Sequence, residues 1–432
     1  MFWTSTRDSR RRTTFLDAVA TNLPGDGGLF VPLELVAFPD VEALFALDAR
    51  ARNEEIFTRL LGDEMSRPEI AELVASAFDF PLPVVRIEEA HAALELFHGP
   101  SLSFKDFGVR FLARVLALLA RRSGEGAVRT VLTATSGDTG AAVVHAFHGL
   151  PGFRVAVLYP RGRIAERQER QMATLGGNVR AFAVDGAFDD CQRLVKEAFA
   201  DAALSRELGL VSANSINVAR LLAQVVYAFE GVASLRREGV ASPPVVCVPS
   251  GNFGNLCATL VARRLGLPLA GLALATNDNT TVPDFLANGD YRPRPSVATL
   301  SNAMDVGAPN NWERVVSLAG GDLARLRAEL RWGSVDDAGT LAEIAWLAAV
   351  GYAADPHGAV ASAVLRQVLA PGETGLFYAT AHPAKFDVTA DGVALPAALA
   401  EAMARPLLAE PLAPEGERLR RALRGEWNRH QE

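Results

Sequence analysis

The stretch HGPSLSFKDF, residues 98–107, places one lysine between two phenylalanines at the expected start of a helix, and the rest of the chain is organised around it. Its Gly-Pro pair is a turn signal, and Ser103 followed three residues later by Asp106 matches a helix-capping pattern. A helix is therefore expected to begin close to Lys105. Apolar side chains then recur at steps of three and four, as on one buried helical face: Phe107, Phe111, Val115 and Leu118.

Lys105 is the candidate catalytic residue of this stretch. In the first turn of a helix the exposed N–H groups carry positive partial charge, and flanking aromatic rings keep water away, so both disfavour the charged ammonium form. A neutral amine is a nucleophile that forms a Schiff base with a carbonyl compound. The alternative is a lysine whose aliphatic stem covers apolar surface while its amine reaches solvent, and this stretch by itself leaves both interpretations open.

Length and charge narrow the class of protein. The chain has 432 residues, roughly three times a typical domain of ~150 residues, which indicates two or three domains. Lysine and arginine number 43 against 50 aspartates and glutamates, a net charge of −7 that does not favour nucleic acid as a partner. The 3 cysteines are too few and too scattered for a disulfide framework or a zinc site.

The apolar segments argue against a membrane partner. Residues 1–12 carry charge where a secretory signal needs an apolar run. The most apolar stretches, such as residues 341–354, include a charged side chain and are too short to cross a bilayer. We therefore expect a cytoplasmic protein.

Beyond Lys105, short β-branched runs alternate with amphipathic helical segments such as residues 165–175 and 218–229. This alternation is typical of an α/β fold with parallel sheets covered by helices on both faces. The runs are residues 128–133, 155–158, 179–184, 245–248, 272–275 and 376–379. We expect a mainly helical amino-terminal domain over 1–90, a small α/β domain over 91–210, a large α/β domain over 211–390, and a helical tail over 391–432.

Two predicted strand-to-helix junctions are rich in glycine, GDTG at residues 137–140 and GNFGN at residues 251–255. Such a turn presents several backbone N–H groups to one point, where the helix dipole adds positive potential, so it can hold a phosphate. Neither matches the ATP-binding or dinucleotide-binding glycine patterns. Either could be a plain turn, but together with Lys105 they favour one site for a phosphorylated cofactor and one for a phosphorylated substrate.

Other catalytic chemistries have less support. His145 and His148 are the one close histidine pair on a predicted helix, and no third ligand lies nearby in the sequence, so no metal is expected. The chain has no G-x-S-x-G nucleophile motif.

Six segments, in this order, resemble the threonine synthase family of fold type II pyridoxal phosphate enzymes: HGPSLSFKD, TSGDTGAA, NSINVARLLAQ, VPSGNFGN, TLSNAMDV and TAHPAKF. The earlier TSTR and PGDGGLFVP resemble the amino-terminal domain of its microbial and fungal form. The matches span residues 4 to about 387. The chain departs from the family pattern at four positions that neighbour the chemistry and bear on substrate preference: Ser101, Ser103, Val218 and Asn302.

The resemblance implies pyridoxal 5'-phosphate as cofactor, bound in a tryptophan synthase β-like fold. Lys105 would bind the cofactor covalently and then act as acid and base, and Thr380 would hydrogen-bond the pyridine nitrogen. The cofactor phosphate would lie in the glycine-rich turn formed by Gly251, Asn252, Phe253, Gly254 and Asn255.

The resemblance also implies the substrate-binding residues. Asp138 stands where related enzymes often have asparagine facing the ring hydroxyl. Asn217 and Arg220 are the candidates for the substrate phosphate, since a guanidinium suits bidentate phosphate contact, although Arg220 could equally be a structural ion-pair partner. The candidates for the substrate carboxylate or the edge of the ring are Ser136, Gly137 and Thr139, and Ser101 is a further candidate for binding the substrate.

The implied reaction is γ-elimination of phosphate from O-phospho-L-homoserine followed by addition of water at the β-carbon, which gives L-threonine, the last step of threonine biosynthesis. Lys105 would remove the α-proton. Two alternatives remain, a related lyase that releases 2-oxobutyrate and a non-catalytic protein that binds the cofactor. The expected partner is the small-molecule substrate, and the expected assembly is a monomer or a homodimer.

Overall fold

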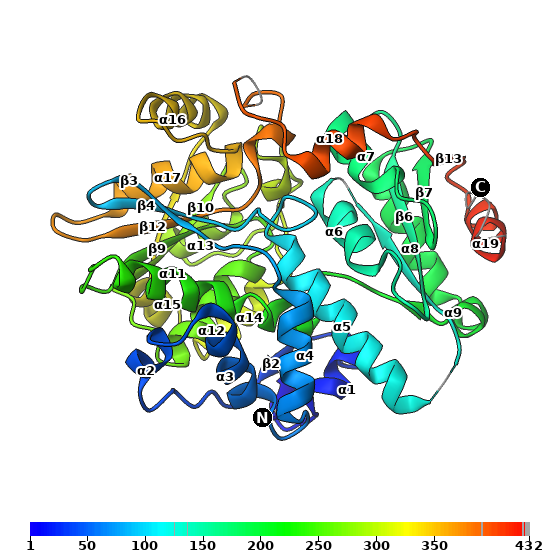
Figure 1. Ribbon diagram of the computed structural model, residues 1–432, viewed down its shortest axis with the longest axis horizontal. Coiled ribbons are helices and arrows are strands. Elements are labelled where there is room, and N and C mark those ends of the chain that lie inside the picture. Colours follow the sequence, from blue (N-terminus) through cyan, green and yellow to red (C-terminus); the bar gives the residue numbers. More distant parts are fainter. Residues whose placement is uncertain (125, 136, 390–391, 426, 428–432) are drawn as a thin grey trace. The chain divides into compact units, whose positions relative to one another are not determined.

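The computed structural model describes residues 1–124, 126–135, 137–389, 392–425 and 427 (Figure 1). The chain forms two compact units. The first comprises Met1–Gly99 and Ser215–Val393, and the second comprises Pro100–Asn214 and Ala394–Glu432.

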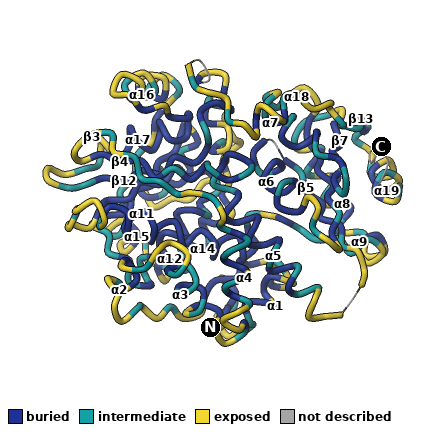
Figure 2. Tube along the Cα trace, in the orientation of Figure 1, coloured by how far each residue is buried: buried dark blue, intermediate teal, exposed yellow. Residues whose placement is uncertain are grey.

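The first unit is built on a six-stranded sheet in the order β11-β10-β9-β12-β4-β3, parallel except for β3, which runs antiparallel to β4. The residues of its central strands are buried on both faces (Figure 2), which explains their continuous runs of valine, leucine and alanine. The strands are β3 (Val84–Glu88), β4 (His91–Glu95), β9 (Val245–Pro249), β10 (Gly271–Thr276), β11 (Leu330–Ser334) and β12 (Gly375–Ala379).

Helices cover both faces of this sheet. On one face α17 (Pro356–Val368) packs on the strands, with α16 (Asp337–Ala349) outside it. On the other face, Gly231 of α11 (Val225–Arg237) lies so close to Leu94 and Leu376 that a Cβ there would come within 3.0 Å of both side chains. The other elements are α10 (Val218–Leu222), α12 (Gly254–Arg264), α13 (Thr281–Asn288), α14 (Trp312–Leu318), α15 (Leu323–Glu329), and the short 3-10 helices η1 (Asn302–Met304) and η2 (Pro383–Lys385).

The amino-terminal segment belongs to the first unit and does not form a compact unit of its own, unlike the separate domain expected over residues 1–90. Its buried Arg52 pairs with Glu230 of α11, and several of its elements pack against helices of residues 215–393. Its elements are β1 (Trp3–Ser5), α1 (Phe15–Thr21), β2 (Phe30–Pro32), α2 (Val41–Phe45), α3 (Ala49–Leu61) and α4 (Arg67–Ala77), with β1 and β2 antiparallel.

The second unit has a five-stranded parallel sheet in the order β13-β7-β6-β5-β8. The strands are β5 (Arg129–Ala134), β6 (Phe153–Pro160), β7 (Val179–Val184), β8 (Leu210–Val211) and β13 (Ala409–Leu412). The helices are α5 (Lys105–Ser123), α6 (Asp138–Phe147), α7 (Glu166–Ala173), α8 (Phe188–Ala200), α9 (Ala202–Leu208), α18 (Ala397–Ala404) and α19 (Gly416–Arg424). Leucines of α8 and α19 share one core cluster with β5, β6 and β7.

All six predicted β-branched runs lie in strands of these sheets. The expectation of a wholly helical tail over 391–432 is wrong, because β13 forms between α18 and α19 and pairs with β7 as an edge strand. An edge position tolerates Pro411, which lacks a backbone donor. The tail is part of the second unit and not a separate region.

One segment of the described chain, Val218–Arg237, is long and apolar enough to cross a membrane by length and composition. Its first part, residues 218–229, is predicted from the sequence as an amphipathic helix of the α/β fold and not as a membrane span. The structure divides it into α10 and α11 and buries it inside the first unit, as is typical of a core helix of a globular protein.

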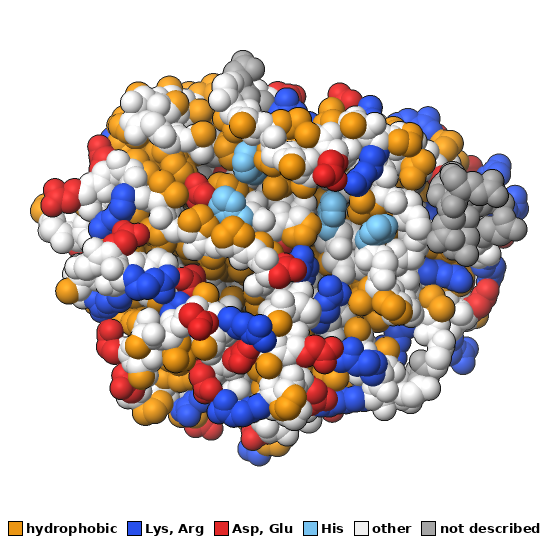
Figure 3. Space-filling view, viewed as in Figure 1, with side chains coloured by type: hydrophobic (Ala, Val, Ile, Leu, Met, Phe, Trp, Pro, Cys, Tyr) orange, Lys and Arg blue, Asp and Glu red, His pale blue; other side chains and the backbone are white. Residues whose placement is uncertain are grey.

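Basic and acidic side chains are intermixed over the visible face of the molecule (Figure 3).

Candidate active site

Lys105 is the first residue of α5, as the sequence predicts, but the predicted cap is wrong. Phe104 occupies the cap position without a side-chain hydrogen bond. The buried carboxylate of Asp106 instead accepts a hydrogen bond of 2.9 Å from the backbone N–H of Ser101. This bond closes a turn in which Leu102 has φ 56°, a left-handed conformation that costs a leucine about 1–2 kcal/mol. The local structure before Lys105 is therefore strained and held by Asp106.

The amine of Lys105 is held inside the second unit. Its Nζ atom lies 3.6 Å from Oδ2 of Asp138 and 5.0 Å from the centroid of the Phe104 ring. The carboxylate and the aromatic face both attract a cation and so favour the charged amine. From the sequence, the aromatic neighbours are expected to favour the neutral amine instead. Asp138 is the first residue of α6, and its carboxylate also accepts a hydrogen bond of 3.0 Å from Nε2 of Gln168.

The turn that contains Asp138 connects β5 to α6. The Thr135 hydroxyl accepts hydrogen bonds from the N–H groups of Gly137 and Gly140, at 3.0 and 2.9 Å, and so fixes the turn. A Cβ atom on Gly137 would lie 2.8 Å from the Gln168 amide, so a side chain there would displace the amide that bonds to Asp138. Thr139 follows in the first turn of α6, and Ser136 lies outside the described residues.

Ser101 is fully buried in the same unit, and its Oγ atom lies 3.0 Å from Oγ of Ser103. Its carbonyl accepts a hydrogen bond of 3.3 Å from Nε2 of Gln171. The structure thus assigns Ser101 contacts that support the turn before Lys105.

The GNFGN turn lies in the first unit, between β9 and α12. Phe253 has φ 59°, and a Cβ on Gly251 would lie 2.7 Å from the carbonyl oxygen of Ala303 in η1, so the turn is both strained and tightly enclosed. Within the described residues, no group accepts a hydrogen bond from the backbone N–H groups of residues 251–255. A row of unused donors at the start of an eleven-residue helix fits an anionic group such as a phosphate.

A further donor beside this turn was missed by the sequence analysis. Asn311 is fully buried, and its Nδ2 atom has no hydrogen-bond partner among the described residues. A Cβ built on Gly254 would lie 3.4 Å from this Nδ2 atom. No local pattern marks Asn311, because its contact with the turn comes from tertiary packing.

Thr380 follows β12 and is 5% exposed. The parallel register pairs Phe377 of β12 with Cys247 of β9, which places Thr380 and the start of the GNFGN turn at the same carboxyl edge of the sheet. Ligands of open α/β sheets bind at this edge.

Asn217 and Arg220 lie on α10 of the same unit. The Asn217 amide caps α10 through a 3.0 Å hydrogen bond from Ala219 N–H and donates to the carbonyl of Val19 at 3.0 Å, so it ties α10 to α1. Arg220 is buried, and burial lowers the pKa of its guanidinium to about 10, which leaves it charged at neutral pH. Its carbonyl accepts a hydrogen bond of 2.7 Å from Gln224, whose amide would lie 3.8 Å from a Cβ on Gly254.

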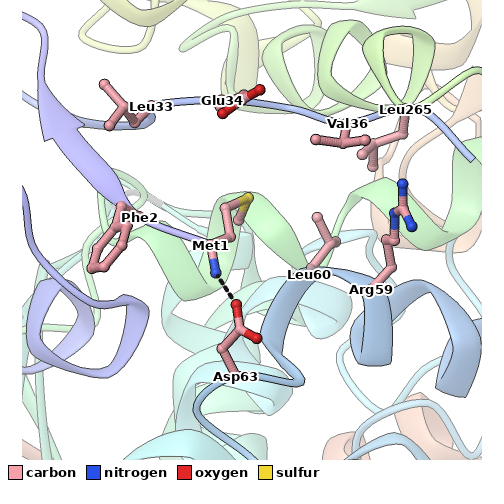
Figure 4. Close-up of a pocket in the computed structure, with 9 residues that line it drawn as sticks. All are labelled: Met1, Phe2, Leu33, Glu34, Val36, Arg59, Leu60, Asp63 and Leu265. Carbon is pink, nitrogen blue, oxygen red and sulfur yellow. Dashed lines mark hydrogen bonds and ion pairs between the residues drawn. The ribbon is translucent and has the colours of Figure 1, made fainter.

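A separate hollow of about 400 Å³ lies in the first unit near the amino terminus (Figure 4). It contains the ion pair between the Met1 amine and Asp63, at 2.9 Å, beside apolar side chains such as Leu60 and Leu265. None of the residues predicted to bind cofactor or substrate lines it.

Comparisons with known proteins agree with these features. A family model described as pyridoxal-phosphate dependent enzyme matches residues 81–378, and one described as threonine synthase N terminus matches residues 2–78. Threonine synthase from Escherichia coli (strain K12) is 47% identical over 424 residues, which cover 96% of this chain and 98% of that protein.

Two solved structures extend the similarity to the fold. The crystal structure of threonine synthase from Escherichia coli has a TM-score of 0.89 at 46% identity, and PLP-bound threonine synthase from Brucella melitensis has 0.92 at 34% identity; each match covers 98% of this chain and 99% of the other. The predicted fold class is confirmed. The chain belongs to the threonine synthase family of pyridoxal-phosphate dependent enzymes.

Proposed function

We propose that this protein converts O-phospho-L-homoserine and water to L-threonine and phosphate in the cytoplasm, with pyridoxal 5'-phosphate as cofactor. One observation carries the proposal: the Escherichia coli threonine synthase is 47% identical to this chain over 96% of its length. The assembly we propose is a monomer or a homodimer.

The residues present suit the cofactor. The unused N–H groups of residues 251–255 would hold its phosphate, Thr380 would donate to its pyridine nitrogen, and Lys105 would bind it covalently. When bound, pyridoxal phosphate draws electrons away from the carbons of an amino-acid substrate, which makes their protons acidic. Once the amine of the substrate has displaced Lys105 from the cofactor, the freed lysine amine would accept and return a proton at the α-carbon, and the distance of 3.6 Å between Lys105 and Asp138 supports an amine that is held in position.

The substrate is held in our proposal by charge and by backbone donors. The turn from Ser136 to Thr139 would orient the substrate carboxylate, and Arg220 would stabilise the negative charge that develops on the departing phosphate. The burial and the retained charge of Arg220 support this role. The contacts of Asn217 support the role of fixing α10, which carries Arg220, more than direct contact with substrate.

Product analysis tests the proposal. Purified protein reconstituted with pyridoxal phosphate should release threonine and phosphate in equal amounts from O-phospho-L-homoserine, with 2-oxobutyrate as a minor product. Dominant 2-oxobutyrate would identify a lyase. A folded protein that binds no cofactor or shows no turnover would contradict the proposed activity.

A further inference from the structure

Three consecutive residues at the start of α14, Asn310, Asn311 and Trp312, each lie against one residue of the GNFGN turn. The N–H of Asn310 donates to Oδ1 of Asn252 at 2.7 Å, and the ring of Trp312 packs edge-on against Phe253 with centroids 5.4 Å apart. Between them, the Asn311 amide lies beside Gly254. These three contacts fix the position of Asn311 relative to the turn.

Arg314 fixes the orientation of the Asn311 amide. Its Nη1 atom lies 2.5 Å from Oδ1 of Asn311, while Nε donates to the carbonyl of Phe30 at 2.8 Å and Nη2 donates to the carbonyl of Ile216. A guanidinium has only donors, so the amide atom that faces Arg314 must be the oxygen. The NH₂ group of Asn311 is therefore the atom beside Gly254, and this assignment does not depend on how amide nitrogen and oxygen are distinguished.

An amide donor in this position needs an acceptor. Asn311 is fully buried, and its Nδ2 has no partner among the residues that the structure describes. A buried donor without a partner costs about 1–3 kcal/mol, and few such groups persist in folded proteins without a reason. The neighbouring N–H groups of residues 251–255 also have no acceptor among the described residues, so these donors and Nδ2 of Asn311 share the need for an acceptor.

We propose that Nδ2 of Asn311 donates a hydrogen bond to the phosphate of pyridoxal phosphate, as the side-chain member of a site whose other donors are backbone N–H groups. Arg314 acts as the positioning residue, because it selects the amide orientation that faces the turn. The inference rests on the proposed function, in which residues 251–255 bind the cofactor phosphate.

The substitution Asn311→Asp isolates this hydrogen bond. Aspartate has the same shape and still offers an oxygen to Arg314, so the apoprotein should unfold at the same temperature as wild type or higher. It replaces the donor by a negative charge facing the phosphate. Loss of a hydrogen bond to a charged group corresponds to roughly 10- to 150-fold in affinity, so we expect the Kd for pyridoxal phosphate to rise by about 100-fold.

Pyridoxal, which lacks the phosphate, serves as the reference ligand. Its Kd should change by less than about twofold in Asn311→Asp, because the lost interaction involves the phosphate alone. The ³¹P resonance of bound pyridoxal phosphate should shift as well. A ratio of the two dissociation constants equal to that of wild type would overturn the assignment. If Asn311→Asp does not fold, Asn311→Ala gives the same comparison, with an expected loss of about tenfold.

Two control variants separate the explanations. Asn288→Asp adds the same charge at an exposed asparagine of the first unit and should leave the ratio unchanged; an equal effect would attribute the loss to net charge and overturn the proposal. Gly254→Val tests the turn itself. If Gly254→Val alters the ratio and Asn311→Asp does not, only the role of Asn311 is wrong. If neither alters it, the proposed phosphate site is wrong.

Discussion

The amine of Lys105 and the buried carboxylate of Asp138 lie 3.6 Å apart, and each residue is the first of its helix. Two helix amino termini therefore converge on one point of the second unit, and their positive potential is offset by the carboxylate. The Lys105 side chain is 13% exposed. This argues against the alternative of a lysine whose amine extends into solvent, because the amine is held by an inward-facing partner.

Lys105→Ala should abolish covalent attachment of the cofactor. Borohydride reduction of the holoenzyme should yield a reduced pyridoxyl group on the peptide that contains Lys105, and the variant should yield none and lose turnover. Lys196 of α8 is exposed, so Lys196→Ala serves as the control and should keep the adduct. A reduced adduct on Lys196 or Lys385 in the wild type would reassign the catalytic lysine.

Gly254→Val should weaken cofactor binding. The new side chain would enter the space beside Asn311 and obstruct the donors of the turn, since its Cβ alone would lie 3.4 Å from Nδ2. We expect the Kd for pyridoxal phosphate to rise at least about tenfold, the loss of roughly one hydrogen bond, with the far-ultraviolet circular dichroism unchanged. Gly126→Val is the matched control, because a Cβ at Gly126 has no atom within 4 Å. If folded Gly254→Val binds pyridoxal phosphate with wild-type affinity, the GNFGN turn does not hold the cofactor phosphate.

Local patterns predicted the sheets and the first residue of α5 because both depend on nearby residues. Runs that contain valine form the buried strands β7 and β9, and both the turn and the helix start at Lys105 lie within ten consecutive residues, 98–107. Tertiary contacts decided the rest. The β13 strand exists only through its pairing with β7, more than 200 residues earlier, and Asp106 bonds to Ser101 instead of forming the predicted cap.

The same distinction applies to the candidate site. The glycine-rich turns were visible because glycine and helix starts leave a sequence signal. Asn311 was not, since one asparagine beside another carries no pattern, and its importance appears only through Arg314 and Gly254. Asn217 shows the converse: its motif is clear, but its amide is engaged with Val19.

Arg220→Ala should impair phosphohomoserine turnover and leave cofactor binding intact. Removing one charge-assisted contact to the leaving phosphate loses about 1.5–3 kcal/mol, or roughly 10- to 150-fold in the affected step. Arg220→Lys, which keeps the charge without the bidentate geometry, should fall between wild type and the alanine variant. Steady-state kinetics and the absorbance of bound cofactor measure the two effects. Normal turnover in Arg220→Ala would show that another residue binds the substrate phosphate. The next candidates would be Ser101, Ser103 and Arg161.

Stability should decrease as the pH falls below about 6.5, because the buried His91 and the half-buried His382 are both held in neutral form. Burial is the main cause that lowers the pKa of His91 to about 4, and it lowers the pKa of His382 to about 4 as well. The Nε2 atom of His91 lies 2.9 Å from the Ser362 hydroxyl, which donates its proton to Glu343 at 2.6 Å. The hydroxyl must therefore accept a hydrogen bond from Nε2–H of neutral His91, and the buried Nδ1 atom, which a second proton would occupy, has no hydrogen-bond partner among the described residues.

The pKa values of both histidines are lower in the folded protein than in the unfolded chain, so protonation favours unfolding. Below about pH 6.5 the unfolded chain binds protons at these histidines while the folded protein does not, so the free energy of unfolding falls as the pH decreases toward 4 and is independent of these groups above about pH 7.5. Between pH 8 and 5 the buried His91 should contribute a loss of about 2 kcal/mol, and the half-buried His382 a smaller loss because solvent screens its charge. The pKa of Glu373 is lowered to about 2 by its hydrogen bond to Arg331, so this group acts mainly at lower pH. Urea unfolding of the apoprotein at pH 8, 6.5 and 5 measures the dependence, and His91→Gln, which keeps a donor for Ser362, should reduce it by about half. An equal loss in wild type and His91→Gln would show that His91 does not contribute.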